Sequence, residues 1–377
     1  MTNLSVEGVF DSLKESTKKT VEGLFPIKGN KRRLELLTVT IDDSNFSVDD
    51  IESQYSARTT GNTWGVPVRV KLRLVDNETN KTLETKTITL MKLPKTTQRY
   101  SYIVKGHERQ VDSVFRLSPG AYHGIADNGD IVAKWNMMKG RGAGGFNVKI
   151  DRETGYLFVE LGRSTKSTKI PLYSICRLLG ATDQEISKEW GEKITTVNKN
   201  KSNLSKNALS IHRAYERKGS EYKPPEVKEA VEYTKRLFSE SKVNSDVARS
   251  TLGLDIESVN YKAMIRTGKR LLGISKGTEK EDDRQSLSVK TLHDIDDFVS
   301  ESILKSKWEI TRKVLNNIDN EDRDISQIMG GANLLKRPVE SVFEAAQLPD
   351  QTNPLQMVSN HTKTTILGRA FGGIAGD

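Results

Sequence analysis

The chain has 377 residues, of which 35% are hydrophobic and 29% are charged, and it carries a formal net charge of +9. That length suits two domains that each bury a core, and the apolar fraction is too high for wholesale disorder. The positive excess favours a polyanionic partner, meaning DNA, RNA or an anionic membrane face, although a merely soluble basic protein would also show it.

Several classes of site are excluded by what the sequence lacks. Cys176 is the only cysteine, so an intrachain disulfide and a thiolate zinc site cannot form, and its apolar flanks predict a buried, inert thiol. The five histidines are scattered without paired spacing, and no Walker loop or nucleophile elbow is present. We therefore predict no catalytic residue and no metal site. No secretory leader and no bilayer-spanning apolar run is found, so we expect a soluble cytoplasmic protein.

The first half of the chain is predicted to open with a helix and to continue as strands. Apolar residues recur at helical spacing over 4–24, and Pro26 ends that helix. Apolar and polar residues alternate over 66–75, with Arg69, Lys71 and Arg73 on the polar face. These cations are either solvated or placed to follow phosphates. Further strands are predicted at 33–40, 83–90, 100–104, 131–135, 146–150 and 156–161, with hairpin turns at 76–81 and 126–130.

The second half is predicted to be mainly helical. Its longest helix, 288–318, carries an apolar stripe that includes Leu304 and Leu315. Residues 191–223 are basic and rich in Asn and Ser, which predicts a linker with a short helix near 206–217. The tail after 347 has no steady period, and such a segment normally needs a partner to order it. The other predicted helices are 170–179, 182–190, 224–242 and 337–347, with a charged loop at 274–286.

The stretch 105–120, KGHERQVDSVFRLSPG, places charged residues at both ends of a short apolar run. Glu108 and Arg109 follow a glycine turn at Gly106, and Arg116 precedes a Ser-Pro-Gly turn. A charged side chain beside a buried segment costs free energy unless an anionic ligand or a buried partner balances its charge. Two interpretations follow: the arginines bind phosphate, or Glu108 and Arg109 form an internal ion pair.

This stretch resembles the G-x-E-R and R-x-S-P-G signature of the β subunit of multisubunit DNA-directed RNA polymerases. Other motifs of that family follow in the same order along the chain. They are Phe25-Pro26-Ile27, the strand 67–75, Leu93-Pro94, Leu157-Phe158-Val159, Pro224-Pro225, the helix within 284–314, Asp350-Gln351 with Asn353-Pro354-Leu355, His361 and Gly372-Gly373. The resemblance covers nearly the whole chain but only the first third of a full β subunit. It is most like the split β subunits of giant bacteriophage RNA polymerases.

The resemblance implies an α+β fold in which a lobe domain is inserted into a mixed protrusion domain. The protrusion would comprise residues 1–125 and 287–345, and the lobe residues 126–286. Residues 346–377 would form a loop beside the RNA–DNA hybrid and a tail that joins the other β fragment.

Two sets of residues take roles from this resemblance. Candidate nucleic-acid contacts are Arg69, Arg73, Arg109, Arg116, Lys139, Arg141, Gln351, Asn353, His361 and Lys363. The structural motif comprises Gly106, Glu108, Ser118, Pro119, Gly120 and Pro354. Lys139 and Arg141 lie in a glycine-rich loop that lacks the phosphate-binding Walker pattern, so a mobile loop is the alternative there.

The resemblance also implies partners. These are a β C-terminal fragment, β′ fragments, a phage promoter-specificity subunit, DNA and nascent RNA, and no membrane. No cofactor is expected in this chain, because the catalytic Mg²⁺ would lie on the β′-like partner. The chain would act in the host cytoplasm during infection, and packaging in the virion stays open.

The sequence departs from the family before Asp350, where residues are missing, and after His361, where Thr362-Lys363-Thr364 replaces an arginine-rich step. In bacterial enzymes this loop forms the rifamycin pocket, so we expect an enzyme that rifampicin does not inhibit. Two other functions remain open: a stand-alone basic nucleic-acid-binding protein, and a nuclease, which the missing acidic metal site disfavours.

Overall fold

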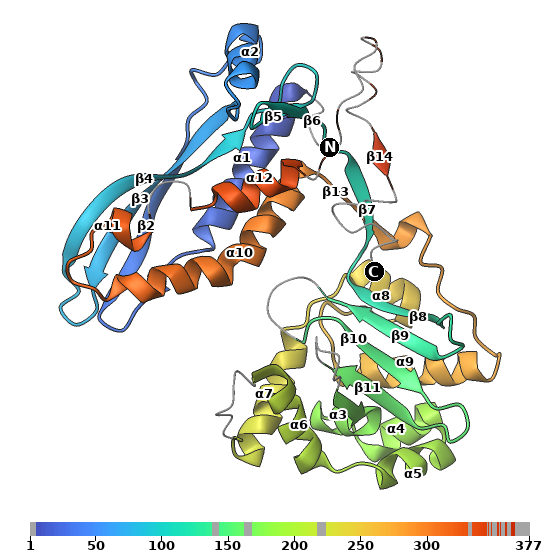
Figure 1. The fold of residues 1–377 in the computed structure, drawn as a ribbon. Helices are drawn as coiled ribbons and strands as arrows, with labels where there is room; N and C mark the ends of the chain where they lie inside the picture. Colours follow the sequence, from blue (N-terminus) through green and yellow to red (C-terminus); the bar gives the residue numbers. More distant parts are fainter. Residues whose placement is uncertain are drawn as a thin grey trace. The chain divides into compact units, whose positions relative to one another are not determined.

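The computed structural model of the chain describes residues 5–137, 143–161, 168–216, 224–330 and 334–344, together with 346, 348, 353, 355, 359 and 363–365. These residues form two compact units (Figure 1). Unit 1 comprises Met1–Arg116 and Leu292–Asp377, and unit 2 comprises Leu117–Thr291. The chain leaves unit 1 in strand β7 (Ser113–Leu117) and re-enters it in β13 (Lys290–His293). Helices and sheets occur in both units, and the predicted α+β class is confirmed.

Unit 1 is built on a four-stranded antiparallel sheet in the order β1-β2-β3-β4. The strands are β1 (Ile27–Lys28), β2 (Arg32–Ile41), β3 (Gly65–Asp76) and β4 (Thr82–Pro94). Helices α1 (Val6–Glu22), α10 (Ile295–Ile318), α11 (Ile325–Ile328) and α12 (Lys336–Glu344) pack on one face (Figure 1). The alternation predicted for 66–75 is confirmed, because the apolar side chains of β3 are buried against these helices.

The long helix α10 starts later than predicted. A 3₁₀ turn (Leu287–Val289) and β13 precede it, and a capping box between Asp294 and Asp297 fixes its first turn. The predicted apolar stripe is partly wrong, because Leu304 and Leu315 are exposed. Helices α1 and α12 cover only the side of α10 that carries Val299, Ile303 and Val314. The apolar face of α10 is therefore wider than the part of it that α1 and α12 cover.

The rest of unit 1 includes residues 105–116 of the motif stretch. It comprises α2 (Ile51–Thr59), which the sequence did not predict, β5 (Tyr102–Val104), β6 (His107–Arg109), β7 and the short strand β14 (Thr364–Thr365). β5 and β6 form a hairpin whose turn residues, Lys105 and Gly106, have φ angles of 50° and 78°. Such a pair of left-handed residues is typical of a tight hairpin turn. A Cβ on Gly106 would also lie 2.8 Å from the Arg58 carbonyl oxygen, so glycine is required there.

Unit 2 contains a five-stranded antiparallel sheet in the order β12-β11-β10-β9-β8. The strands are β8 (Gly120–Ile125), β9 (Ile131–Asn136), β10 (Phe146–Ile150), β11 (Leu157–Leu161) and β12 (Thr168–Pro171). The helices are α3 (Leu172–Leu178), α4 (Asp183–Trp190), α5 (Glu192–Asn200), α6 (Leu204–Glu216), α7 (Val227–Ser239), α8 (Ser245–Leu252) and α9 (Tyr261–Ser275). Because β8 pairs with β9, unit 2 begins before residue 126, the expected start of the insertion.

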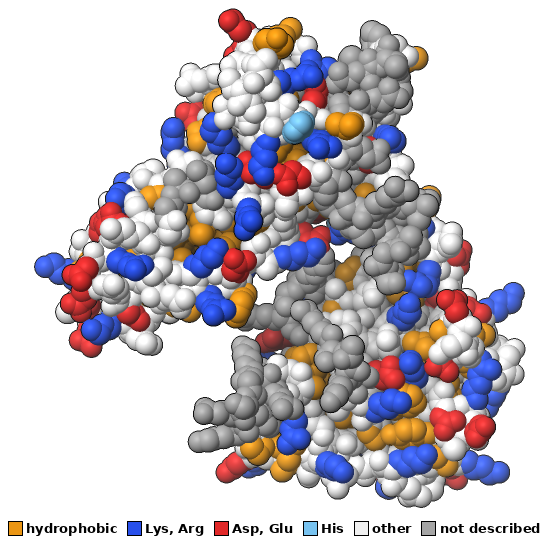
Figure 2. Space-filling model, in the orientation of Figure 1, with side chains coloured by type: hydrophobic (Ala, Val, Ile, Leu, Met, Phe, Trp, Pro, Cys, Tyr) orange, Lys and Arg blue, Asp and Glu red, His pale blue; other side chains and the backbone are white. Residues whose placement is uncertain are grey.

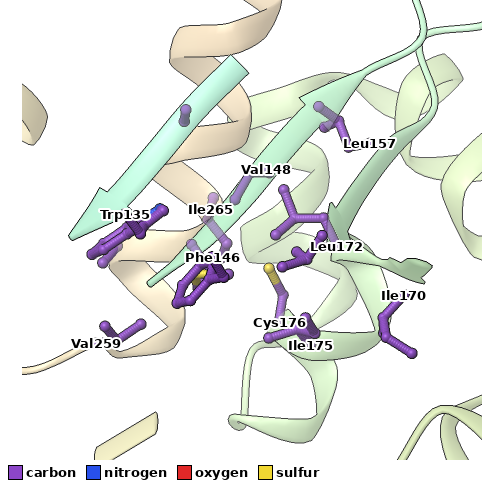
Figure 3. Packing of buried hydrophobic residues seen from close by; sticks show 14 of the residues in the cluster. Trp135, Phe146, Val148, Leu157, Ile170, Leu172, Ile175, Cys176, Val259 and Ile265 are labelled. Atoms are coloured by element: carbon purple, nitrogen blue, oxygen red, sulfur yellow. The ribbon is translucent and has the colours of Figure 1, made fainter. Parts of the chain in front are cut away.

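The core of unit 2 lies between the sheet and its helices (Figure 3). Trp135 and Phe146 stack with ring centroids 5.6 Å apart, and Phe238 meets Phe146 edge-on. Cys176 is fully buried, as predicted, and burial raises the pKa of its thiol well above the ordinary value. The core therefore holds the one cysteine in its unreactive, protonated form.

The prediction of a linker over 191–223 is wrong where α5 forms, whereas the short helix predicted near 206–217 is confirmed by α6. The side chain of Asn198 accepts a 2.9 Å hydrogen bond from the Leu157 backbone N–H and donates a 3.1 Å bond to the Gly155 carbonyl. Ala208 and Ile211 of α6 are fully buried. The buried side chain of Asn198 therefore links α5 to the turn before β11. The spacing of hydrophobic residues in a sequence does not predict a hydrogen bond of this kind.

Candidate nucleic-acid interface

The outer face of the unit 1 sheet carries the cations predicted on β3. Arg69 and Lys71 are exposed, and neither makes an ion pair with any described residue. Arg73 differs, because its guanidinium binds the Glu35 carboxylate with a closest N–O distance of 2.6 Å. Hydrogen bonds from Arg33 and Arg73 hold the pKa of Glu35 below its usual value. Arg69 and Lys71 are thus available to an anion in this structure, whereas the charge of Arg73 is already balanced.

Glu108 is a buried carboxylate whose side chain is 5% exposed. It accepts a 2.7 Å hydrogen bond from Arg99 Nε, a 3.3 Å bond from Arg58, and a bond from the Ser101 hydroxyl. Burial alone would raise the pKa of Glu108, but the bonds from Ser101 and Arg99 outweigh burial and hold the pKa below its usual value. Glu108 therefore ties β6 to α2 and to the segment before β5.

The expected ion pair between Glu108 and Arg109 is wrong. Adjacent residues of a strand point to opposite faces, so the two side chains diverge along β6. Arg109 is half-buried and donates a 3.5 Å hydrogen bond to the Ala346 carbonyl, at the start of the C-terminal tail. Glu108 does form internal ion pairs, but its partners are Arg58 and Arg99.

Arg116 lies against helix α10. Its guanidinium is 2.7 Å from the Glu301 carboxylate and lies over the Phe298 ring, 5.0 Å from the centroid. The side chains of Arg116 and Glu301 are only 16% and 14% exposed. This arginine therefore fastens β7 to the long helix, and its contact with phosphate stays a prediction.

The Ser-Pro-Gly motif forms a joint at the edge of unit 2. The Ser118 N–H donates to the Val289 carbonyl at 2.9 Å, and the Pro119 carbonyl accepts from the Asn244 N–H at 2.9 Å. A Cβ on Gly120 would lie 2.3 Å from Val247 Cγ1. The three motif residues thus contact either α8 and the residue that precedes it or the segment around Val289. These contacts explain the Ser-Pro-Gly motif by its role in the fold.

Part of the C-terminal tail lies beside the 105–120 stretch. β14 pairs with β7 in parallel, with Thr364 opposite Ser113 and Thr365 opposite Val114. Lys363 Nζ lies 3.6 Å from Asp112 Oδ2, and that carboxylate is 7% exposed. Asn353 is exposed. Lys139, Arg141, Gln351, Pro354 and His361 fall outside the described residues.

The structure thus brings Arg109 and Lys363 together around one motif and leaves Arg69 on the outer sheet face. Sequence reasoning missed Arg58, Arg99 and Lys105, the last of which binds Glu340 and Glu344 on α12. The signal for Arg58 and Arg99 was Glu108 itself, since a buried acid requires cations. No group of three or more His, Cys, Asp or Glu side chains suited to a metal ion occurs among the described residues. Within the same residues, no helix is long and apolar enough to cross a membrane.

Comparison with known proteins adds an independent finding. The chain is similar to β subunits of bacterial DNA-directed RNA polymerases. The β subunit of Syntrophomonas wolfei is 24% identical over an aligned length of 376, and the alignment covers 94% of this chain and 33% of that subunit. The β subunit of Oceanobacillus iheyensis is 29% identical over 210 residues, covering 53% of this chain and 17% of the subunit. That of Lactobacillus delbrueckii is 27% identical over 200 residues, covering 52% and 15%.

The chain spans a third or less of the length of these curated relatives. No family model matches it. The alignment with the Syntrophomonas subunit runs through both structural units, so the similarity extends well beyond the 105–120 motif.

Proposed function

We propose that this chain is the N-terminal fragment of a split β subunit in a bacteriophage multisubunit RNA polymerase. The observation that carries the proposal is the similarity along 94% of the chain to one third of a bacterial β subunit. The order of the motifs along the chain supports assigning it to the N-terminal third of such a subunit. Unit 1 would then be the protrusion and unit 2 the lobe.

In this role the chain contributes binding surface, and catalysis depends on its partners. Mg²⁺ and the residues that hold it would lie on a β′-like chain, and this chain would take part in nucleotidyl transfer only as a subunit. The exposed cations Arg69 and Lys71 support contact with a polyanion, because neither makes an ion pair with a described residue, although Asp42 lies near enough to Arg69 to interact with its charge. Downstream DNA, the nontemplate strand and the RNA–DNA hybrid are the proposed ligands.

The tail supports a junction with a second β fragment. Its described part adds strand β14 to β7, and Lys363 and Ala346 both contact the motif stretch. The partners are a β C-terminal fragment and β′ fragments, with a promoter-specificity subunit as a further candidate.

The experiment is an affinity purification of the tagged chain from infected cells, with the partners identified by mass spectrometry. The proposal predicts stoichiometric recovery of proteins similar to the rest of β and to β′. Recovery of the chain as a monodisperse monomer that binds duplex DNA by itself would favour a stand-alone nucleic-acid-binding protein instead. A matched pull-down with Glu321→Gln, which alters only an exposed ion pair with Lys31, should recover the same partners.

A further inference from the structure

The outward face of the unit 2 sheet carries an aromatic pair between two lysines. Leu157 and Val159 of β11 are buried in the core, so Tyr156 and Phe158, which alternate with them, lie on the opposite face. Their rings stack with centroids 5.7 Å apart and planes inclined by 23°. The ammonium of Lys201 lies 4.5 Å from the Tyr156 centroid, and that of Lys169 lies 5.0 Å from the Phe158 centroid.

Three separate elements build this array. Tyr156 and Phe158 come from β11 and its preceding turn, Lys169 from the neighbouring strand β12, and Lys201 from the end of α5. Both rings are half-buried, so they keep part of their surface open to solvent. Burial raises the pKa of Tyr156, so its hydroxyl stays neutral at physiological pH.

Lysines slightly outnumber acids on this face, where Asp130 and Glu160 both lie within ion-pair distance of Lys149. Lys134 of β9 and Lys169 of β12 are exposed, and Lys149 of β10 pairs with Glu160 at 3.1 Å. Hydrogen bonds from Thr154 and from the Glu153 N–H lower the pKa of Asp151, so this carboxylate is an anion near Lys201, whereas Lys134 and Lys169 make no ion pair with a described residue. Figure 2 shows hydrophobic, basic and acidic side chains interspersed over the visible face of unit 2. Aromatic rings flanked by cations on an open sheet are suited to a ligand that alternates flat rings with anionic groups.

We propose that Tyr156 and Phe158, with Lys169 and Lys201, form a stacking platform for single-stranded nucleic acid. Bases stack on the two rings, and the lysine ammonium groups move from the rings to the adjoining phosphates. Duplex DNA does not fit the platform, because its bases are already stacked on one another. This inference deepens the proposed function and rests on it for the source of the strand, which is either the displaced DNA strand or the transcript.

The test is photochemical cross-linking of the full chain to short single strands that contain 5-bromouracil, in separate DNA and RNA arms. Halogenated uracil cross-links to aromatic side chains on which it stacks, so the expected product lies in the tryptic peptide 153–163, bounded by Arg152 and Arg163. Either arm giving this product supports the platform, and the stronger arm identifies the strand. Cross-links confined to other peptides would overturn the inference while leaving the polymerase role intact.

Variants give a second readout. Tyr156→Leu keeps the apolar bulk and removes the ring, so single-strand affinity should fall about fivefold or more. Lys169→Gln and Lys201→Gln should each reduce the dependence of log affinity on log salt by roughly one. Tyr55→Leu removes an exposed tyrosine from α2 and is the matched control, with no loss of affinity expected. Unchanged affinity in all three platform variants, or tighter binding of duplex than of single strands, would contradict the platform. Failure of the chain to purify with any polymerase fragment would instead contradict the proposed function.

Discussion

Arg99 Nε donates a 2.7 Å hydrogen bond to the Glu108 carboxylate, and this pair joins the segment before β5 to strand β6. Glu108, the acidic residue of the motif, thus stabilises the fold. Arg58, from α2, completes the arrangement at 3.3 Å. Arg58 and Arg99 therefore hold the fold, whereas Arg69 and Lys71 on β3 make no ion pair with a described residue.

The first prediction concerns Glu108. Glu108→Gln removes the negative charge but keeps the shape, which leaves Arg99 and Arg58 facing a neutral group. The free energy of unfolding of unit 1 should fall by about 2 kcal/mol, the scale of a hydrogen bond to a charged group. Urea denaturation followed by circular dichroism measures it. Glu321→Gln, at an exposed pair, should change stability by less than about 1 kcal/mol. Equal effects in the two variants would show that Glu108 does not stabilise the fold.

The second prediction concerns pH and unit 2. His123 is buried and its Nδ1 lies 2.7 Å from Asp282, which in turn binds Arg270; Glu279 faces the same guanidinium. Burial outweighs Asp282 and lowers the pKa of His123, so the folded state binds the proton less readily than the unfolded state. Neutral His123 therefore contributes fully to the free energy of unfolding above the ordinary histidine pKa of about 6.5. This contribution is lost as the pH falls below that value.

Urea midpoints measured between neutral and mildly acid pH test this dependence. His123→Gln cannot titrate, so its midpoint should decline less over that range than that of the wild type. His107→Gln, at an exposed position in unit 1, should follow the wild type. Parallel curves for wild type and His123→Gln would exclude His123 as the source of the pH dependence.

The third prediction concerns the Ser-Pro-Gly motif. Gly120→Ala would place a methyl group 2.3 Å from Val247 Cγ1, in a region that is already packed. We expect a loss of about 1–3 kcal/mol in the free energy of unfolding of unit 2. The double variant Gly120→Ala/Val247→Ala should recover part of that loss, because it creates room for the methyl group. Gly124→Ala, which meets only the flexible end of Glu281 at 3.2 Å, is the milder control. A neutral Gly120→Ala would refute the packing argument.

The fourth prediction concerns the open cations of β3. Arg69→Gln and Lys71→Gln should each weaken nucleic-acid binding and reduce the salt slope by roughly one if both contact phosphate. Binding isotherms at several salt concentrations measure this slope. Lys313→Gln, which removes an exposed lysine already paired with Glu309, is the matched control. A slope that does not differ between the β3 variants and this control would place the phosphate contacts elsewhere.

Local patterns in the sequence predicted much of the fold. The alternation over 66–75 predicted β3 and its buried face, because a strand with one face on a core encodes that face every second residue. The helix predicted over 182–190 is confirmed as α4, which begins with a capping box between Thr182 and Glu185. These signals depend on residues close in sequence.

Contacts between distant residues were not predictable in this way. α5 is held by Asn198, and Glu108 is paired with Arg58, fifty residues away in sequence. Polar bonds of this kind have no period, so the sequence alone indicated a linker in the first case and the wrong ion-pair partner in the second. Resemblance to a family supplied the motif order, but it could not distinguish an arginine that fastens a helix, such as Arg116, from one that remains open, such as Arg69.

The most direct test of the central claim is RNA synthesis by the complex purified through this chain. The account predicts that the complex, with its β and β′ partner fragments, elongates RNA on a DNA template in the presence of Mg²⁺, and that the chain alone does not. Retention of full polymerase activity in partner fragments from which this chain has been removed, or its purification without any such partner, would contradict the account.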